Sequence, residues 1–455
     1  MKKFNKDKYL RKLKFKRFYR KYERYFYIGI PCLLIAILGI YFAYSKFTAI
    51  ADTEVVRTTV GEFIQGDVVI KIYVNGEYSE TAPQKNTGYK VDSIVCDNGA
   101  IGEWNNDDWG PTITNVTKRN KCNIYFTEKE KVKFGNIGIA LDVYDRCPSL
   151  NDDGTVTVTG AEDTCGYLCK AKDAYGYSYY FRGNVTNNYV LFGGFYWRII
   201  RMNGDGSVRV IYDGTSAHVN GESSEDRIIG RREFNEYLHD NAHIGYMYGK
   251  FGGKYNTLSS SSYELAHANV NDSTIKTYVD TWYENNIKGT ANEKYIVDNL
   301  FCNDRSFASN NSGKGYARID TDYRWYNFAD TSYNNKMMLT CPQQNDAFTV
   351  NDTSKGNGAL TYGIGLLTAD EAVLAGGWNT NNSNYYLYIG HPIYTLSPSN
   401  YKGGTASTVI ISDLGKFSDD LVADEINGVR PVISLTSEVL AQGDGTTSNP
   451  FHLAS

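Results

Sequence analysis

One uninterrupted apolar stretch dominates the pattern of hydrophobic and polar positions along the chain. Residues 25–44 read YFYIGIPCLLIAILGIYFAY, twenty residues without a charge. A helix of this length extends over roughly 30 Å at about 1.5 Å per residue, which matches the hydrocarbon core of a bilayer. We therefore predict a transmembrane helix over residues 25–45 that contacts the lipid bilayer.

The charges before this stretch predict its orientation. Residues 2–24 contain twelve Lys or Arg and two acidic residues, a net charge of +10, whereas the first charge after the stretch is Lys46. Basic flanks stay on the cytoplasmic side of a membrane. We expect residues 1–24 to be a basic cytoplasmic tail and the protein to be a single-pass protein of the cell membrane, with the bulk of the chain extracellular. Signal-peptide cleavage near residues 48–51 stays open as an alternative.

Alternation with a period of two then predicts a small β-sandwich-like module over residues 53–128. Residues 68–74 read VVIKIYV, and the Asn75-Gly76 pair that follows favours a type I′ hairpin turn. Further short strands are expected at residues 89–96, 113–116 and 121–126. No residue pattern in this module indicates chemistry, so we interpret it as a spacer or accessory module.

A larger, loop-rich domain is expected over residues 132–455. Its clearest hairpins lie within residues 189–212, which are rich in β-branched and aromatic residues. Its first helix has Asp272 or Ser273 as the N-cap and an apolar face with the spacing i, i+3, i+4, i+7, formed by Ile275, Tyr278, Val279 and Trp282. The second helix begins at Thr368 with a Thr-Ala-Asp-Glu capping box and stops at Gly376. Strands and helices together predict the α+β class.

Charge excludes one class of partner. Removing the tail's twelve basic and two acidic residues from the chain's 47 and 51 leaves 35 and 49, a net charge near −14. An acidic surface repels phosphate backbones, so we expect no nucleic-acid ligand.

Seven cysteines follow the apolar stretch, on a side where disulfides persist: Cys96, Cys122, Cys147, Cys165, Cys169, Cys302 and Cys341. Strand positions predict a Cys96–Cys122 disulfide, and we also expect a Cys302–Cys341 disulfide. Cys147 is expected to pair with either Cys165 or Cys169, which leaves one of these three cysteines unpaired.

The sequence contains no catalytic constellation. His239 and His243 have the i, i+4 spacing of a helical zinc site, but Asp240 replaces the glutamate of that motif and no third ligand is evident. We interpret both histidines as exposed loop residues. A nucleophile elbow, a P-loop and a dinucleotide fingerprint are all missing from the sequence. We therefore predict no catalytic residue, no metal and no cofactor.

Four segments in order resemble a family of uncharacterised bacterial surface domains: residues 192–200 (FGGFYWRII), 365–371 (GLLTADE), 394–399 (YTLSPS) and 428–432 (GVRPV). The order of these segments resembles the C-type-lectin-like fold, which the formylglycine-generating enzymes share. The resemblance implies an α+β domain of that fold. Those enzymes use cysteines late in the domain, whereas this chain has none after Cys341, which argues against that activity.

We interpret the chain as a membrane-anchored extracellular recognition or adhesion protein with a glycan or protein ligand. The alternatives are a cell-surface enzyme that uses the large domain, or a structural envelope protein. The predicted ligand surface lies in the polar, aromatic segment after the second helix, at Trp378, Asn379, Asn384 and Tyr385. Aromatic faces stack on sugars, and amides donate and accept hydrogen bonds.

Overall fold

The computed structural model describes residues 68–249, 267–306 and 335–454, apart from gaps at 86, 107, 118, 143–145, 163, 165, 403 and 424–426, together with residues 11 and 14. The predicted transmembrane helix at residues 25–45 lies outside the described residues, as does nearly all of the basic tail. Within the part of the chain that is described, no helix has the length and apolarity needed to cross a membrane.

The fold is mostly β, with 40% strand and 11% helix, and this overturns the predicted α+β class. Only two α-helices occur among the described residues, and both are short: α3 (Thr274–Asn286) and α5 (Ala369–Leu374). Both lie where the sequence predicts a helix. The error lies in segments that were expected to be loops, because they contribute strands such as β22 (Ile393–Lys402).

The chain divides into two compact units between Glu128 and Lys129. The first unit holds a four-stranded sheet with the order β2-β1-β6-β3, in which β1 and β6 are parallel. Its strands are β1 (Val68–Val74), β2 (Glu77–Ser79), β3 (Tyr89–Cys96) and β6 (Asn120–Glu128). A hairpin of β4 (Ile101–Asn105) and β5 (Gly110–Thr114) supplies Trp104 and Trp109, which pack on Phe126 of the sheet. Asn75 and Gly76 both have positive φ, as the predicted type I′ turn requires.

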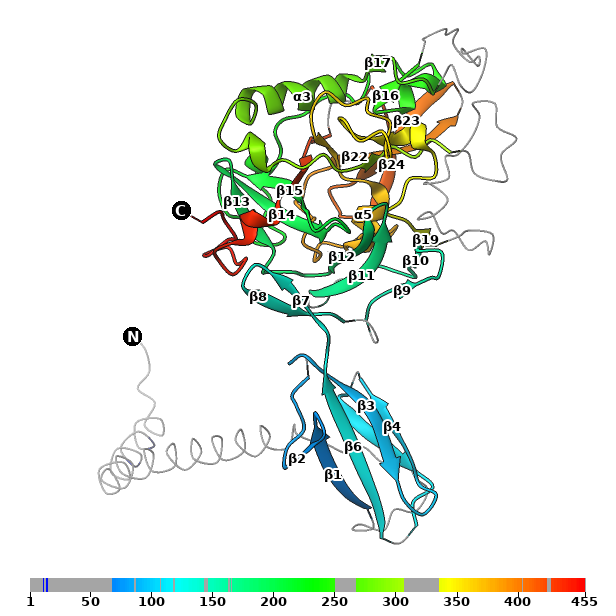
Figure 1. The fold of residues 1–455 in the computed structure, drawn as a ribbon, viewed down its shortest axis with the longest axis vertical. Coiled ribbons are helices and arrows are strands. Elements are labelled where there is room, and N and C mark those ends of the chain that lie inside the picture. Colours follow the sequence, from blue (N-terminus) through cyan, green and yellow to red (C-terminus); the bar gives the residue numbers. More distant parts are fainter. Residues whose placement is uncertain are drawn as a thin grey trace, which may run out of the picture. The chain divides into compact units, whose positions relative to one another are not determined.

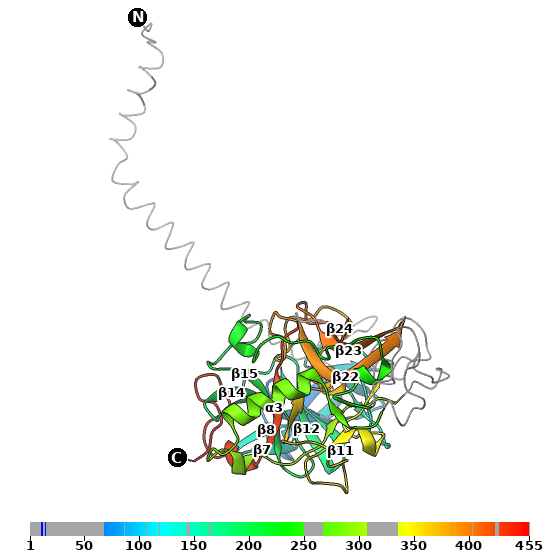
Figure 2. The same ribbon diagram turned by 90° about the horizontal axis from the view of Figure 1, so that it is seen from above.

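The second unit is built on a larger antiparallel sheet, with the path β11-β12-β14-β15-β25-β21 and with β13 paired to β14 (Figure 1). Its strands are β11 (Tyr167–Asp173), β12 (Gly176–Arg182), β13 (Tyr189–Phe192), β14 (Phe195–Met202), β15 (Val208–Gly214), β21 (Ile364–Leu366) and β25 (Pro431–Leu435). Helix α3 lies beside β14 and β15 in both views (Figures 1 and 2), where Trp282 packs against Phe195, Trp197 and Tyr212.

Smaller sheets complete the second unit. One three-stranded sheet consists of β22 (Ile393–Lys402), β23 (Thr405–Ile411) and β24 (Phe417–Leu421), and a second has the order β19-β10-β9. The short strands are β7 (Lys131–Phe134), β8 (Ile137–Ala140), β9 (Ser149–Leu150), β10 (Val156–Thr157), β16 (Met247–Tyr248), β17 (Asn271–Asp272), β18 (Phe301–Cys302), β19 (Lys336–Met337) and β20 (Ala347–Phe348). The 3-10 helices are η1 (Glu225–Arg227), η2 (Asn241–Ile244), η3 (Glu293–Tyr295), η4 (Gln344–Asp346) and η5 (Ser437–Leu440).

Three disulfides join Cys96 to Cys122, Cys147 to Cys169 and Cys302 to Cys341. The two pairings predicted without an alternative are present, and Cys147 pairs with Cys169, while Cys165 lies outside the described residues. Cys96 and Cys122 face each other directly across β3 and β6. Three such cross-links are typical of an extracellular or secreted protein, because reducing compartments keep thiols free.

Buried ion pairs hold α5 against the large sheet. Glu371 of α5 contacts Arg209 at 2.6 Å and Arg201 at 3.2 Å, and it also closes the predicted capping box with Thr368. Burial alone would raise the pKa of Glu371, but the two guanidinium groups and the cap hydrogen bond hold the pKa below its usual value. The carboxylate is therefore charged in the core and fixes the start of the helix.

Candidate functional site

The predicted ligand surface after α5 is not a surface. Trp378 is 6% exposed and the ring of Tyr385 is fully buried, so the interpretation of these two residues as ligand contacts is wrong. The turn that carries them is drawn inward by Asn382, whose amide donates to the carbonyls of Glu162 and Gly376. Of the two predicted amides, Asn384 is exposed and Asn379 is half-buried. The four residues therefore do not combine into one site.

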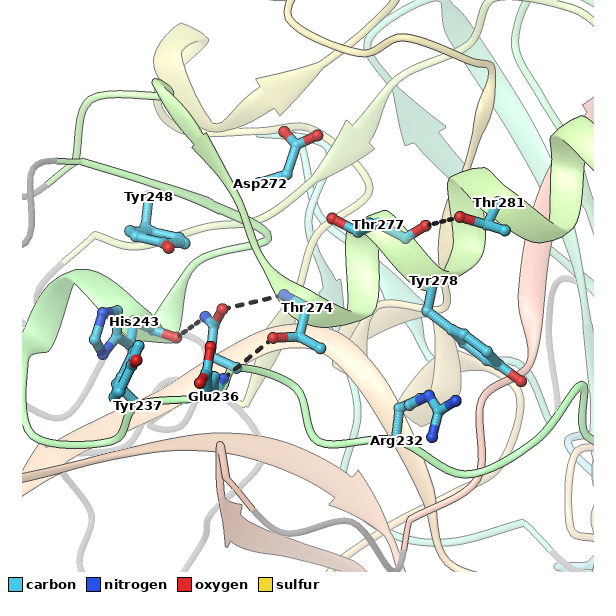
Figure 3. A pocket seen from close by; sticks show the side chains of 11 residues that line it. Arg232, Glu236, Tyr237, His243, Tyr248, Asp272, Thr274, Thr277, Tyr278 and Thr281 are labelled. Carbon is cyan, nitrogen blue, oxygen red and sulfur yellow. Dashed lines mark hydrogen bonds between the residues drawn. The ribbon is translucent and has the colours of Figure 1, made fainter.

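A pocket of about 440 Å³ opens elsewhere, beside the first half of α3 (Figure 3). It is bounded by α3, by the end of β17 and by the segment of residues 232–248. The side chains that line it are mostly polar or aromatic: Arg232, Asn235, Glu236, Tyr237, His243, Tyr248, Asp272, Thr274, Thr277, Tyr278 and Thr281. We call it the α3 pocket.

Helical spacing puts four of these side chains on one face of α3. Thr274, Thr277, Tyr278 and Thr281 have the spacing i, i+3, i+4, i+7, while Ile275 and Val279 are buried in the core. Tyr278, which was expected on the apolar face with them, is half-buried and contributes to both the core and the pocket. Ser273 caps the helix by accepting a hydrogen bond from the backbone of Lys276. A helix that is apolar on one side and rich in threonine on the other thus presents hydroxyl groups to the pocket.

The geometry of these hydroxyls makes them hydrogen-bond acceptors. Thr277 donates its hydroxyl to the carbonyl of Ser273, and Thr281 donates to the carbonyl of Thr277. Tyr278 likewise donates its phenol to the carbonyl of Ile229 at 2.7 Å. With their protons committed to backbone carbonyls, the oxygens offer lone pairs to a ligand.

Asn235 fixes the pocket's opposite wall to the helix. Its side chain accepts a hydrogen bond from the backbone N–H of Thr274 and donates to the carbonyl of His243 at 2.6 Å. The next residue, Glu236, donates its backbone N–H to the hydroxyl of Thr274. Figure 3 shows this chain of hydrogen bonds crossing from the loop to the helix. The wall and the helix are therefore held in one arrangement.

Aromatic rings and carboxylates gather at one end of the pocket, which we call the acidic end. Tyr237 lies 6.0 Å and Tyr248 lies 5.1 Å from the ring of His243, measured between ring centroids. The carboxylates of Glu236 and Asp272 are exposed here. Burial, then the negative charges of Glu236 and Asp272, raise the pKa of Tyr248. Asp272 also pairs with Lys276 at 3.1 Å, which offsets part of its charge.

The other end of the pocket is basic. Arg232 is exposed, and its guanidinium lies 5.1 Å from the ring centroid of Tyr278 in a cation–π arrangement. Figure 3 shows Arg232 and Tyr278 together at this end, away from His243, Tyr237 and Tyr248. The pocket thus carries opposite charges at its two ends.

The two histidines with zinc-like spacing face different partners. His239 is exposed and its Nδ1 lies 3.2 Å from the carbonyl of Gly404, whereas His243 is only 2% exposed, which corrects the expectation that both are exposed. Asp240, between them, instead caps η2 by accepting from the backbone of Ala242. In the described ranges, no group of three or more His, Cys, Asp or Glu side chains is placed to hold a metal ion.

Sequence reasoning missed the α3 pocket, although one signal was available. The polar side of the predicted helix α3 carries Thr274, Thr277 and Thr281 at helical spacing, and this row of hydroxyls could have been interpreted as one wall of a pocket. The rest of the pocket comes from residues about forty positions earlier, which no local pattern connects to the helix. Protein-family models, curated proteins and solved structures yield no match to the chain.

Proposed function

We propose that the protein is an extracellular recognition protein that binds an amine-bearing saccharide in the α3 pocket. The observation that carries this proposal is the acidic end of the pocket, where Tyr237, His243 and Tyr248 adjoin the carboxylates of Glu236 and Asp272. Aromatic faces attract cations, and a nearby carboxylate adds a direct charge interaction.

The hydrogen-bonding capacity of the pocket supports the same ligand class. Carboxylates accept only, and the hydroxyls of Thr277 and Thr281 already donate to the backbone. A ligand that complements the carboxylates and these hydroxyls must therefore be rich in donors, while Arg232 at the basic end requires an acceptor. A sugar with hydroxyl groups and a protonated amine meets this requirement, and its ring also offers apolar faces to tyrosine rings.

An enzyme is the alternative, because the pKa values of His243 and Tyr248 are both shifted and such shifts gather at catalytic sites. We favour binding because His243 is only 2% exposed, so its ring has little access to a substrate. The remaining lining is formed by hydroxyls, carboxylates and rings that suit recognition.

Attachment to the cell membrane is part of the proposal. The twenty uncharged residues at 25–44 and the net charge of +10 before them support a single membrane crossing with the N-terminus in the cytoplasm. The two units, each of which contains at least one internal disulfide, would then face the exterior, where glycan ligands are found. A bacterial surface location rests on the sequence resemblance alone.

A matched pair of oligosaccharides tests the ligand class. The full-length protein in detergent is titrated calorimetrically with fully deacetylated chitotetraose and with its N-acetylated counterpart, at a pH where the free amines are protonated. We expect the deacetylated tetramer to bind at least about tenfold more tightly, which corresponds to about 1.4 kcal/mol. Glu236→Gln should weaken this binding, while Glu438→Gln, an exposed glutamate outside the pocket, should leave it unchanged.

Equal affinity for the two tetramers would contradict the proposed role of the amine. Absence of binding by either would contradict the saccharide, and an unchanged affinity in Glu236→Gln would remove the α3 pocket as the site.

A further inference from the structure

The outward face of the first unit's sheet carries a row of tyrosines. Register pairs Tyr78 of β2 with Tyr73 of β1, and Tyr73 with Tyr125 of β6, so the three rings cross three neighbouring strands. Tyr73 stacks on Tyr125 with ring centroids 5.0 Å apart, and Tyr78 meets Tyr73 at an angle of 74°. Tyr78 is 63% exposed. The row is therefore a rigid aromatic surface in contact with solvent.

The alternation of the strands shows that this face is not the core. Ile72, Ile124 and Phe126, which alternate with the tyrosines, are buried beneath Trp104 and Trp109 of the β4–β5 hairpin. The tyrosine face lies on the opposite side of the pleat. On the same face, Val69 and Val95 are each more than half exposed. Exposed apolar and aromatic side chains on one face indicate an interaction surface.

The same face is basic, although the chain as a whole is acidic. Lys71 lies two residues from Tyr73 on β1, and Lys121 lies four residues from Tyr125 on β6, and both are exposed. None of the described outward positions paired in this sheet holds a carboxylate, whereas the exposed Asp92 is the unpaired residue of the β3 bulge, between Val91, which pairs with Phe126, and Ser93, which pairs with Tyr125. Asp97, which follows β3 beside Lys121, accepts hydrogen bonds from the backbone of Lys121 and the amide of Asn120.

We propose that this face, the tyrosine–lysine face, binds an acidic polysaccharide that lies along the strands. A chain in this direction meets the tyrosine row first, then Lys71 and, about 13 Å from the row at roughly 3.3 Å per residue, Lys121. Tyrosine rings contact the faces of sugar rings, and the ammonium groups pair with carboxylates spaced along the polymer. The face thus offers both interactions that an acidic polysaccharide needs.

Charge argues against two other occupants. A second copy docked through the same face would bring two surfaces that both carry exposed lysines together, and their charges repel. A duplex nucleic acid carries a far denser negative charge than a uronic acid polymer, so the net charge near −14 outside the tail opposes its approach more strongly.

Binding of full-length protein in detergent to immobilised polygalacturonate and to neutral dextran tests the proposal. We expect binding to polygalacturonate that weakens as salt is raised, and none to dextran. The double variant Lys71→Gln/Lys121→Gln should weaken binding at least about tenfold, and Tyr78→Ala should weaken it several-fold. All three side chains are exposed, so the variants keep the fold, which circular dichroism checks.

Matched controls lie in the second unit. Lys355→Gln removes an exposed lysine, and Tyr177→Ala removes an exposed tyrosine whose ring already has the ammonium of Lys170 at 4.1 Å. Neither should change binding. The proposal is overturned if polygalacturonate does not bind, if the face variants bind as well as the controls, or if dextran or single-stranded oligothymidine binds equally well.

Discussion

The ring of His243 meets the ring of Tyr248 edge-on, with 5.1 Å between centroids and 90° between planes. His243 is buried, and Tyr248 at the pocket's acidic end is only partly exposed. The histidine therefore supports the ring that a ligand would touch. Burial lowers the pKa of His243, and the charge of Asp240 opposes this shift only in part.

This lowered pKa predicts a pH dependence of stability. The unfolded chain takes up a proton on this histidine below about pH 6.5, while the folded protein resists it, so stability is complete above that pH and is lost as the pH falls. Urea unfolding between pH 7.5 and 5.5 should show a smaller loss for His243→Gln than for the wild type. His239→Gln, which changes an exposed neighbour, should behave as the wild type does. Parallel pH profiles for all three proteins would refute the assignment.

The buried carboxylate of Glu371 predicts a large cost of substitution. Glu371→Gln leaves Arg209 and Arg201 without their shared anion in the core, and removal of one member of a buried ion pair costs about 3–5 kcal/mol. Glu284→Gln, which affects the exposed pair with Lys288, should change stability far less, because solvent screens that pair. Denaturant midpoints measure both effects. Similar midpoints for the two variants would show that the buried network does not stabilise the fold.

The disulfide assignment predicts the outcome of peptide mapping. Under non-reducing conditions Cys147 should be recovered attached to Cys169, and not to Cys165. The Cys302–Cys341 bridge spans 39 residues, and the chain-entropy model gives a loss of roughly 4 kcal/mol when such a loop is opened. Cys302→Ser/Cys341→Ser should therefore unfold at lower urea than the wild type. A Cys147–Cys165 peptide, or an unchanged midpoint, would contradict these assignments.

Local signals in the sequence were sufficient for much of the fold. Asn75 and Gly76 form the predicted turn, Ser273 caps α3, and Thr368 forms the capping box with Glu371. Each of these features could be predicted because it depends only on residues within a few positions of one another. The pairing of Cys96 with Cys122 followed from the positions of two strands. The α3 pocket could not be predicted from such local signals, because it depends on contacts between residues far apart in the chain.

Buried polar side chains explain why the fold class was wrong. Strand β22 crosses a segment that reads as loop because Thr395, Ser397 and Ser399 interrupt its apolar residues, yet all three are buried. Thr395 donates its hydroxyl to the carbonyl of Val409, and Ser397 accepts from the backbone of Ala369. Polarity suggested exposure, whereas these partners satisfy the hydroxyls in the interior. The same reasoning placed Trp378 and Tyr385 on a ligand surface, because amide side chains lie beside them in the sequence, although both residues are buried.

Surface labelling of lysines tests the proposed orientation in the membrane. A membrane-impermeant amine reagent added to intact cells that produce the chain should modify exposed lysines of both units, such as Lys71 and Lys355, because the proposed orientation places those units outside. Lysines within residues 2–24 should stay unmodified, since the proposal places the basic tail in the cytoplasm. Peptide mass spectrometry reads the modified positions, and cells lysed before labelling provide the control in which both regions react. Modification of the tail with protection of Lys71 and Lys355 would reverse the orientation, and modification of both regions in intact cells would show that no bilayer separates them.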